Sequence, residues 1–318
     1  MTYRPLEWKN YIGQTKLKER LKLHARGAEA RNEPMPHVLL IGPPGCGKTT
    51  LARLIAQEVS ADYQSFMMPI NDTLLRSFVE EFRGVVLFDE LHRASPKQQE
   101  SFLTLVEDGY LQLPNGAQIF NDQLTIIGAT TEGDRIIKPL FDRFPVKPLF
   151  DEYTDEEMVQ ILGNFAEAEA CNFSRETLEV LAPACLGVPR NARSFIKTAV
   201  DLWYQGDNEP SAEAVLEVMR ITPEGLTAEH LKYCKLLARA GGQAGLDLMR
   251  TLLGLPTRAV EDLEIDLLKQ GLLKREKSGR VLTSRGYVVA GPTKQLRFGL
   301  KAQASARKES KRAKEFFK

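Results

Sequence analysis

The sequence predicts an α/β protein in which a parallel sheet with flanking helices precedes a small helical lid and a C-terminal winged helix. Three observations lead to this prediction. Short apolar runs alternate with helical patterns in the first half of the chain, which favours a parallel sheet covered by helices. From Thr154 the pattern is helical throughout, and further helical segments then precede a short strand pair. The predicted domains are residues 1–153, 154–221 and 222–290, and residues 291–318 are expected to form a disordered basic tail.

The first domain is predicted from its apolar runs and the helices between them. Three runs have the length of buried strands, at residues 37–41, 85–88 and 124–128. A helix is predicted from about Lys48 to Val59, directly after a glycine-rich turn. Ser95 followed by Pro96 has the form of an N-cap and a first helical residue, so a second helix is expected to begin there.

Two hairpins are predicted from pairs of short strand-like runs. Residues 110–113 and 117–120 flank a Pro-Asn-Gly turn. Near the end of the chain, residues 271–275 and 279–283 flank a charged turn. Because this second pair follows several helical segments, it has the form of the wing in a winged helix.

The composition is that of a globular protein and excludes several classes. The chain has 318 residues, of which 43% are hydrophobic and 27% charged, and this length suits two or three domains. An apolar run of membrane-spanning length and an apolar secretory signal are both missing from the sequence. The four cysteines show no CxxC spacing, so neither a zinc site nor a disulfide framework is expected. A cytoplasmic protein with reduced thiols is therefore predicted.

The net charge of +1 conceals an asymmetry. Residues 291–318 hold nine Lys or Arg and two Glu, and the rest of the chain is net negative. Basic tails often contact nucleic acid, because lysine and arginine neutralise phosphates. On charge alone, a solvated tail with no partner is an equal alternative.

A glycine-rich loop joins the run 37–41 to the helix that begins at Lys48. The loop matches G-x-x-x-x-G-K-[ST], a phosphate-binding pattern in the strand–loop–helix context that it requires. Its glycines allow backbone N–H groups to curl around phosphate oxygens, and the helix N-terminus adds partial positive charge. Lys48 is predicted to reach the β- and γ-phosphates of ATP, and the Thr49 hydroxyl to bind Mg²⁺. The predicted nucleotide-binding residues of the loop are Gly42, Pro43, Gly45, Cys46, Gly47, Lys48, Thr49 and Thr50.

Acidic and hydroxyl side chains end the next two predicted strands. Asp89 and Glu90 follow the run 85–88. Asp89 is predicted to hold the hydration shell of Mg²⁺, and Glu90 to polarise the water that attacks the γ-phosphate. Thr130 and Thr131 follow the run 124–128, where a hydroxyl can sense the γ-phosphate or orient the water. Capping of the next turn is the alternative role for both threonines.

Two arginines complete the candidate site. Arg143 lies between aromatic residues, and an arginine in such a fixed loop can reach the γ-phosphate of a neighbouring subunit. A surface ion pair is the alternative. Arg190 follows Pro189 in the first turn of a predicted helix, where a cation opposes the helix dipole. An anion near Arg190 is therefore expected, and ATP phosphate is a suitable one.

In their order along the chain, these segments resemble the RuvB family of AAA+ ATPases, hexameric motors that drive branch migration of Holliday junctions. The resemblance extends from about residue 4 to residue 290. It implies ATP and Mg²⁺ as cofactors, a homo-hexamer, the duplex arms of branched DNA as substrate, and a RuvA-like partner. The matching segments are residues 4–5, 11–14, 37–40, the phosphate loop, 89–93, 128–131, 142–144, 187–190, 241–242 and 279–283.

The resemblance also assigns roles to individual residues. Lys48 and Thr49 are implied to bind ATP and Mg²⁺, and Asp89 and Glu90 to form the hydrolytic pair. The remaining implied roles are Thr131 as first sensor, Arg143 as arginine finger, Arg190 as second sensor, Tyr11, Ile12 and Tyr153 as adenine and ribose contacts, and Arg280 as a DNA contact on the wing.

Two departures from the family pattern indicate a divergent relative. Glu132 follows Gly-Ala-Thr-Thr, where the family usually has Arg. The stretch between residues 107 and 125 is also shorter than in the family, and it carries the hairpin by which RuvB engages RuvA. Leu111 and Leu113 are expected to form a small apolar face on this hairpin, and a housekeeping RuvA is expected to bind poorly. Packing of the hairpin on its own ATPase domain is the alternative.

Two alternatives to a DNA motor belong to other functional classes. A clamp-loader- or initiator-like AAA+ protein would remodel a protein on DNA without translocating. A winged-helix binding module could use its nucleotide site only as a regulatory sensor, but a pure sensor does not need Glu90 as a hydrolytic base. Closed hexameric rings around duplex DNA would distinguish a motor from a loader.

Overall fold

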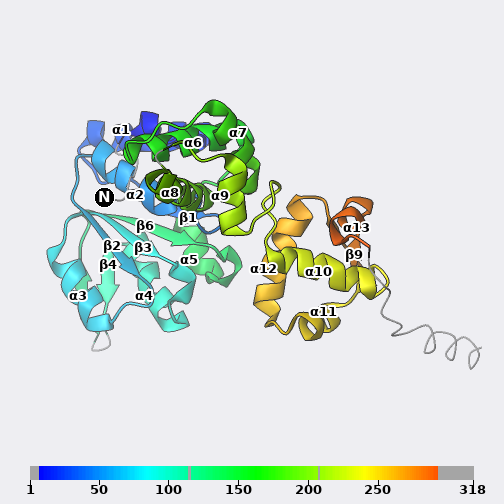
Figure 1. Cartoon of the computed structure of the whole chain (residues 1–318). Coiled ribbons are helices and arrows are strands. Elements are labelled where there is room, and N and C mark those ends of the chain that lie inside the picture. The colour runs from blue at the N-terminus through cyan, green and yellow to red at the C-terminus, as the bar shows by residue number, and fades with distance from the viewer. Residues whose placement is uncertain (1–6, 114–115, 207, 293–318) are drawn as a thin grey trace, which may run out of the picture. The chain divides into compact units, whose positions relative to one another are not determined.

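The computed structural model describes residues 7–113, 116–206 and 208–292. It divides into two compact units, residues 1–212 and 213–318 (Figure 1). Pro114, Asn115 and almost all of the basic tail lie outside the described residues. In the described part of the chain, no helix combines the length and the apolar character needed to cross a membrane. The domain boundaries predicted after residues 153 and 221 stay predictions.

A parallel sheet forms the centre of unit 1. In the described residues it has the strand order β1-β6-β3-β2. These strands are β1 (Val38–Ile41), β2 (Tyr63–Met67), β3 (Gly84–Asp89) and β6 (Leu124–Thr130). The central strand β6 pairs with both β1 and β3. Because parallel strands end at the same edge, the phosphate loop after β1, Asp89 of β3 and Thr130 of β6 lie close together.

In β1, β3 and β6, successive apolar residues enter two different cores, one on each face of the sheet. Leu39 and Phe88 belong to the first core, and Val38 and Leu87 to the second. The first core is covered by α3 (Asp72–Glu81), α4 (Pro96–Glu107) and α5 (Lys138–Arg143), and the second by α1 (Thr15–Arg31) and α2 (Lys48–Glu58). The sheet is therefore covered by helices on both faces, as the apolar runs predict (Figure 1).

Capping residues set the helix starts where the sequence predicts them. The Oγ of Ser95 accepts a hydrogen bond from the backbone N of Gln98 at 3.2 Å, and Pro96 is the first residue of α4. Thr154 and Glu157 form the predicted capping box at the start of α6 (Asp155–Ala168). The helical part of unit 1 continues with α7 (Arg175–Ala184) and α8 (Pro189–Gly206).

The first predicted hairpin exists as β4 (Tyr110–Gln112) and β5 (Gln118–Phe120). Leu111 and Leu113 share one apolar face as expected, and this face packs on its own ATPase domain, which was the alternative to a docking role. Leu111 is only 4% exposed and belongs to the first core, and Leu113 packs partly against the same core. The apolar face therefore stabilises the hairpin's own domain, whereas Phe120 is 66% exposed.

Unit 2 has the architecture of a winged helix. The elements from residue 212 onwards are α9 (Ala212–Met219), α10 (Ala228–Arg239), β7 (Gln243–Ala244), α11 (Leu246–Leu253), α12 (Thr257–Lys269), β8 (Leu273–Glu276), β9 (Gly279–Leu282) and α13 (Ser284–Ala290). β8 and β9 form the predicted antiparallel wing, and β7 pairs with β9 on its other side. The helices enclose a separate core around Tyr233 and Leu237.

Candidate functional site

Most residues of the predicted nucleotide site line a cavity of about 350 Å³ in unit 1. The predicted residues that line it are Tyr11, Ile12, Gly45, Cys46, Gly47, Lys48, Thr49, Thr50, Asp89, Glu90, Tyr153, Pro189 and Arg190. They come from the phosphate loop with the start of α2, the end of β3, the N-terminal segment, the segment before α6 and the start of α8. Four predicted residues lie outside this lining: Gly42, Pro43, Thr131 and Arg143.

The phosphate loop has the tight curvature that its glycines allow. Gly47 has a φ of 104°, a conformation that favours glycine. A Cβ on Gly47 would also lie 2.7 Å from the hydroxyl oxygen of Tyr11. Lys48 begins α2, and its Nζ donates hydrogen bonds to the carbonyls of Gly42 (2.7 Å) and Pro43 (2.9 Å). Gly42 and Pro43 therefore hold the lysine that the cavity presents.

Two buried tyrosines form the wall next to the phosphate loop. The hydroxyl of Tyr153 donates to the carbonyl of Cys46 at 3.1 Å, and that of Tyr11 reaches the same carbonyl at 3.5 Å. Burial raises the pKa of Tyr153 to about 12 and holds the pKa of Tyr11 well above its ordinary value. Both rings therefore stay neutral near pH 7 and present an aromatic surface suited to a nucleotide base.

Thr49 and Asp89 meet at the predicted metal site. The Oγ1 of Thr49 donates to the Oδ2 of Asp89 at 3.1 Å, and the backbone N of Glu90 donates to Oδ1 at 3.0 Å. Mg²⁺ binds hydroxyl and carboxylate oxygens and usually takes its other ligands from phosphates and water. The residues present therefore fit Mg²⁺ held together with a nucleotide. Among the described residues, no group of three His, Cys, Asp or Glu could hold a metal by itself.

Glu90 is held on one side of its carboxylate. Its backbone is left-handed, with a φ of 53°, an uncommon conformation for a residue other than glycine. The Oγ1 of Thr131 donates to Oε2 of Glu90 at 3.2 Å. The backbone N of Glu132 donates to Thr130, not Thr131, at 3.0 Å. Thr130 therefore caps the turn after β6, whereas Thr131 contacts the predicted base.

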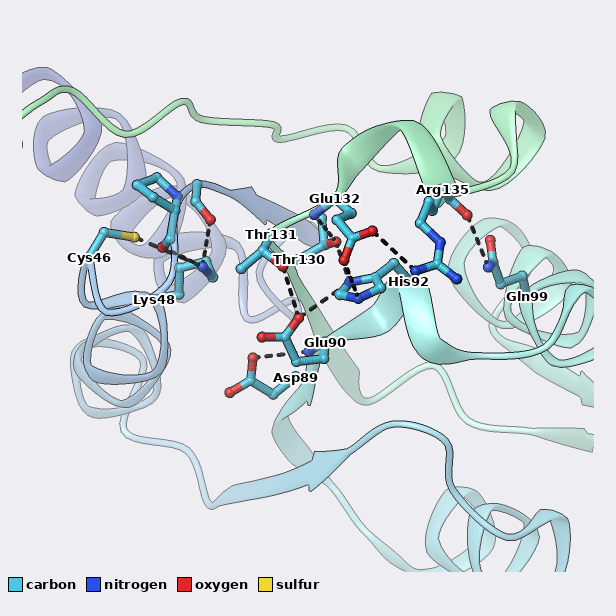
Figure 2. A network of polar contacts seen from close by, with 12 residues as sticks. Cys46, Lys48, Asp89, Glu90, His92, Gln99, Thr130, Thr131, Glu132 and Arg135 are labelled. Carbon is cyan, nitrogen blue, oxygen red and sulfur yellow. Dashed lines mark hydrogen bonds and ion pairs between the residues drawn. The ribbon is translucent and has the colours of Figure 1, made fainter. Parts of the chain in front are cut away.

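His92 joins this network although the sequence predicts no role for it. It lies in the short 3-10 helix η2 (Leu91–Arg93) and its side chain is 2% exposed. Its Nδ1 lies 3.0 Å from Oγ1 of Thr130 and 3.3 Å from Oε2 of Glu90. Its Nε2 lies 3.2 Å from Oε1 of Glu132, which also pairs with Arg135. Figure 2 shows the resulting chain from Glu90 through His92 to Arg135.

The two predicted arginines occupy different environments. Arg190 is exposed in the first turn of α8, and a Cβ on Gly45 would lie 2.8 Å from its Cβ. The guanidinium of Arg190 is thereby placed at the phosphate loop. Arg143 ends α5, pairs with Glu107 and donates from Nη1 to the carbonyl of Pro139 at 3.1 Å. The surface ion pair given as its alternative role is therefore present, and Arg143 lies outside the cavity lining. Its role as an arginine finger stays a prediction.

Several lining residues are missed by sequence reasoning. These are Asn10, Pro44, Met67, Ile161, Asn164, Phe165 and Arg193. Arg193 follows Arg190 by three residues on α8, so both lie on the same helix face. That spacing could have identified Arg193. The residues from α6 carry no motif, since their position depends on how α6 and α8 pack.

In unit 2, the predicted DNA contact Arg280 is mostly buried. Its side chain is 17% exposed, and its Nε donates to Oε1 of Glu264 at 2.8 Å. Nearby on the wing and on α13, Lys274, Lys277 and Arg285 are exposed. The role of Arg280 in binding DNA stays a prediction, and it has to be reconciled with this ion pair.

Comparisons with known proteins match both units. Residues 3–149 match the P-loop domain of the Holliday junction DNA helicase RuvB. Residues 223–290 match the RuvB C-terminal winged helix domain.

Individual relatives match almost the whole chain. The Holliday junction branch migration complex subunit RuvB of Campylobacter fetus is 33% identical over 309 residues, which cover 92% of this chain and 90% of the relative. The corresponding Nitratiruptor subunit is 32% identical over 305 residues, 91% of each chain. The structure of the Thermotoga maritima RuvB branch migration motor superposes with a TM-score of 0.78 at 29% identity, over 90% of this chain and 97% of that one.

Proposed function

This chain belongs to the RuvB family of Holliday junction branch-migration motors, and we propose that it hydrolyses ATP to move the duplex arms of branched DNA. The observation that carries this proposal is one cavity lined by the phosphate loop and by both Asp89 and Glu90. A regulatory nucleotide sensor needs the loop but has no use for a positioned base. Thr131 donates to that base, so the pieces of a hydrolytic site lie together within unit 1.

In this mechanism each residue has one task. Lys48 and the loop amides would hold the phosphates, and Thr49 and Asp89 would hold Mg²⁺. When bound, Mg²⁺ neutralises charge that develops on the phosphate oxygens. Glu90 orients the attacking water. Thr131 and His92 both contact Oε2 of Glu90, and the second oxygen points toward the side where Lys48 lies (Figure 2).

The working assembly is a homo-hexamer in which Arg143 acts on the ATP of the next subunit. Two contacts support this assignment: the ion pair with Glu107 and the hydrogen bond to Pro139 fix the guanidinium at the end of α5. A fixed guanidinium outside its own cavity suits a site completed by a neighbour. An arginine finger can contribute roughly 10³–10⁵ in rate.

The winged helix of unit 2 supplies the contact with duplex DNA. Lys274 and Lys277 are exposed on the wing, and Arg280 lies on its second strand. These cations would bind phosphates without reading sequence. A housekeeping RuvA is a poor partner in this scheme, because Leu111 and Leu113 pack against their own domain. Loading would then depend on another partner or on the basic residues of this chain.

The test separates ATP binding, hydrolysis and movement. Lys48→Ala should abolish ATP binding, whereas Glu90→Gln should bind ATP and lose turnover. The parent chain should dissociate a synthetic four-way junction when ATP and Mg²⁺ are present, and both variants should fail. Turnover by Glu90→Gln close to the parent rate would exclude Glu90 as the base. ATP hydrolysis without any junction movement, with or without a RuvA-type protein, would exclude the motor.

A further inference from the structure

Among the described residues of unit 2, one carboxylate is completely buried among cationic and hydroxyl donors. Glu264 lies on α12 and is 0% exposed. It accepts hydrogen bonds from the hydroxyl of Tyr233 on α10 (2.9 Å), from Nη2 of Arg275 on β8 (2.8 Å) and from Nε of Arg280 on β9 (2.8 Å). A single side chain of α12 therefore connects this helix to α10 and to both strands of the wing.

The pairing of β8 with β9 brings two arginines together, and this explains why the wing needs the carboxylate. Arg275 and Arg280 are directly paired across β8 and β9. Like charges at paired positions of an antiparallel ladder destabilise the pair. Glu264 offsets this repulsion, since its Oε2 accepts from Arg275 and its Oε1 from Arg280.

The ionised form of Glu264 is the one that these donors stabilise. Burial by itself would raise the pKa of the carboxyl. The hydrogen bonds from Arg280, Arg275 and Tyr233 outweigh burial and hold the pKa of Glu264 below its ordinary value. A buried anion with several donors is costly to neutralise or remove, because the donors are then left without their partner.

We infer that Glu264 is a positioning residue for DNA binding, which fixes the guanidinium groups of Arg275 and Arg280 on the wing for contact with duplex phosphates. This inference rests on the proposed role of the wing as a DNA contact. Arg280 binds Glu264 through Nε, and Arg275 through Nε and Nη2. Glu264 does not use Nη1 and Nη2 of Arg280 or Nη1 of Arg275. These nitrogens can therefore donate to a phosphate.

A positioning role for Glu264 predicts a change in DNA affinity opposite in direction to the one expected from charge alone. Glu264 is an anion beside a surface that binds a polyanion, so removing its charge should strengthen DNA binding if charge alone mattered. If Glu264 instead orients the two arginines, removing its charge should weaken DNA binding. The substitution Glu264→Gln keeps the side-chain shape and one acceptor oxygen and removes the charge.

The experiment measures the binding of full-length protein to a labelled duplex over a series of salt concentrations. Glu264→Gln should raise the dissociation constant about tenfold, the equivalent of about 1.4 kcal/mol. Tyr233→Phe is the matched control, because it removes a donor to the same carboxylate without touching the wing. It should lower the unfolding temperature and leave DNA affinity unchanged. Unchanged or tighter binding by Glu264→Gln, with unit 2 shown to be folded by its unfolding transition, would overturn the inference.

A double substitution separates this inference from the proposed function. In an Arg275→Ala/Arg280→Ala background, Glu264→Gln should weaken DNA binding no further, because the groups that it orients are gone. A further loss of the same size in that background would overturn the positioning role. If Arg275→Ala/Arg280→Ala and Lys277→Ala all bind DNA like the parent, the wing itself is not the DNA contact and the proposed function fails at that point.

Discussion

The contact between Glu132 and His92 can be removed by Glu132→Leu, which deletes a carboxylate and keeps much of the side-chain volume. The imidazole of His92 is 2% exposed, and its Nε2 lies 3.2 Å from Oε1 of Glu132. The substitution removes the hydrogen-bond acceptor of this buried nitrogen. We expect lower stability of unit 1 and slower ATP hydrolysis, because His92 also contacts the predicted base Glu90.

The size of the stability loss follows from two contacts of Glu132. A hydrogen bond with one charged partner contributes about 1.5–3 kcal/mol, and here it reaches a buried nitrogen. The pair between Glu132 and Arg135 is exposed on the arginine side, so it contributes roughly 0–1 kcal/mol. The sum is about 1.5–4 kcal/mol. For a unit of about 200 residues this corresponds to a fall of about 3–16 °C in the unfolding temperature.

Calorimetry and steady-state ATP hydrolysis measure the two effects on the same samples. Arg135→Ala is the first control, since it removes the exposed pair only and should cost less than about 1 kcal/mol. Asp134→Asn is the second control, because it removes an exposed carboxylate of the same 3-10 helix, η3 (Gly133–Arg135), and should change neither quantity. A Glu132→Leu protein as stable and as active as the parent would refute the reasoning.

Three further predictions concern other parts of unit 1. Arg143→Ala should bind ATP and lose turnover by a factor of roughly 10³ or more. Mixing it with Lys48→Ala subunits should restore part of the ATP hydrolysis. If rings shown to contain both subunits recover none of it, action between subunits is excluded. Burial lowers the pKa of His37 to about 4, below its ordinary value near 6.5. Its neutral form therefore contributes stability above pH 6.5 that is lost as the pH falls through about 4, at most about 3 kcal/mol. Denaturant titrations at pH 7 and pH 4.5 should show a smaller change in the free energy of unfolding for His37→Asn than for the parent chain. An equal change in both proteins would contradict this cause. Leu111→Asp should destabilise unit 1 by about 3 kcal/mol or more in a urea titration, because it buries a charge; exposed Phe120→Asp is its control, and equal effects of the two would refute the packing argument.

The sequence is sufficient to predict the central strands and the nucleotide loop. β1, β3 and β6 are continuous apolar runs because helices cover both faces of the sheet. β2, at one end of the described strand order, is not predicted because exposed Gln64 and Ser65 interrupt its apolar pattern.

The side-chain networks were not predictable from motifs, because each depends on which strands and helices are neighbours. Glu90 and Thr131 meet because β3 lies next to β6, and sequence spacing does not give that order. Glu264 could have been noticed. It lies four residues after Val260 and three before Leu267, both buried on α12, so the helical pattern places an acid on the apolar face. A charge in that place implies a partner from another element.

The unusual glutamate at position 132 affects which nitrogen of His92 faces the base. The backbone N–H of Glu132 donates to the hydroxyl oxygen of Thr130, so the hydroxyl hydrogen is available to Nδ1 of His92. A neutral imidazole that accepts this hydrogen at Nδ1 carries its own hydrogen on Nε2, where Oε1 of Glu132 can accept it. An arginine at this position, as the family usually has, cannot accept from Nε2. The hydrogen would then move to Nδ1, where it can be donated to Glu90. We therefore expect the residue at position 132 to influence whether the imidazole presents a lone pair or a hydrogen to the predicted base Glu90.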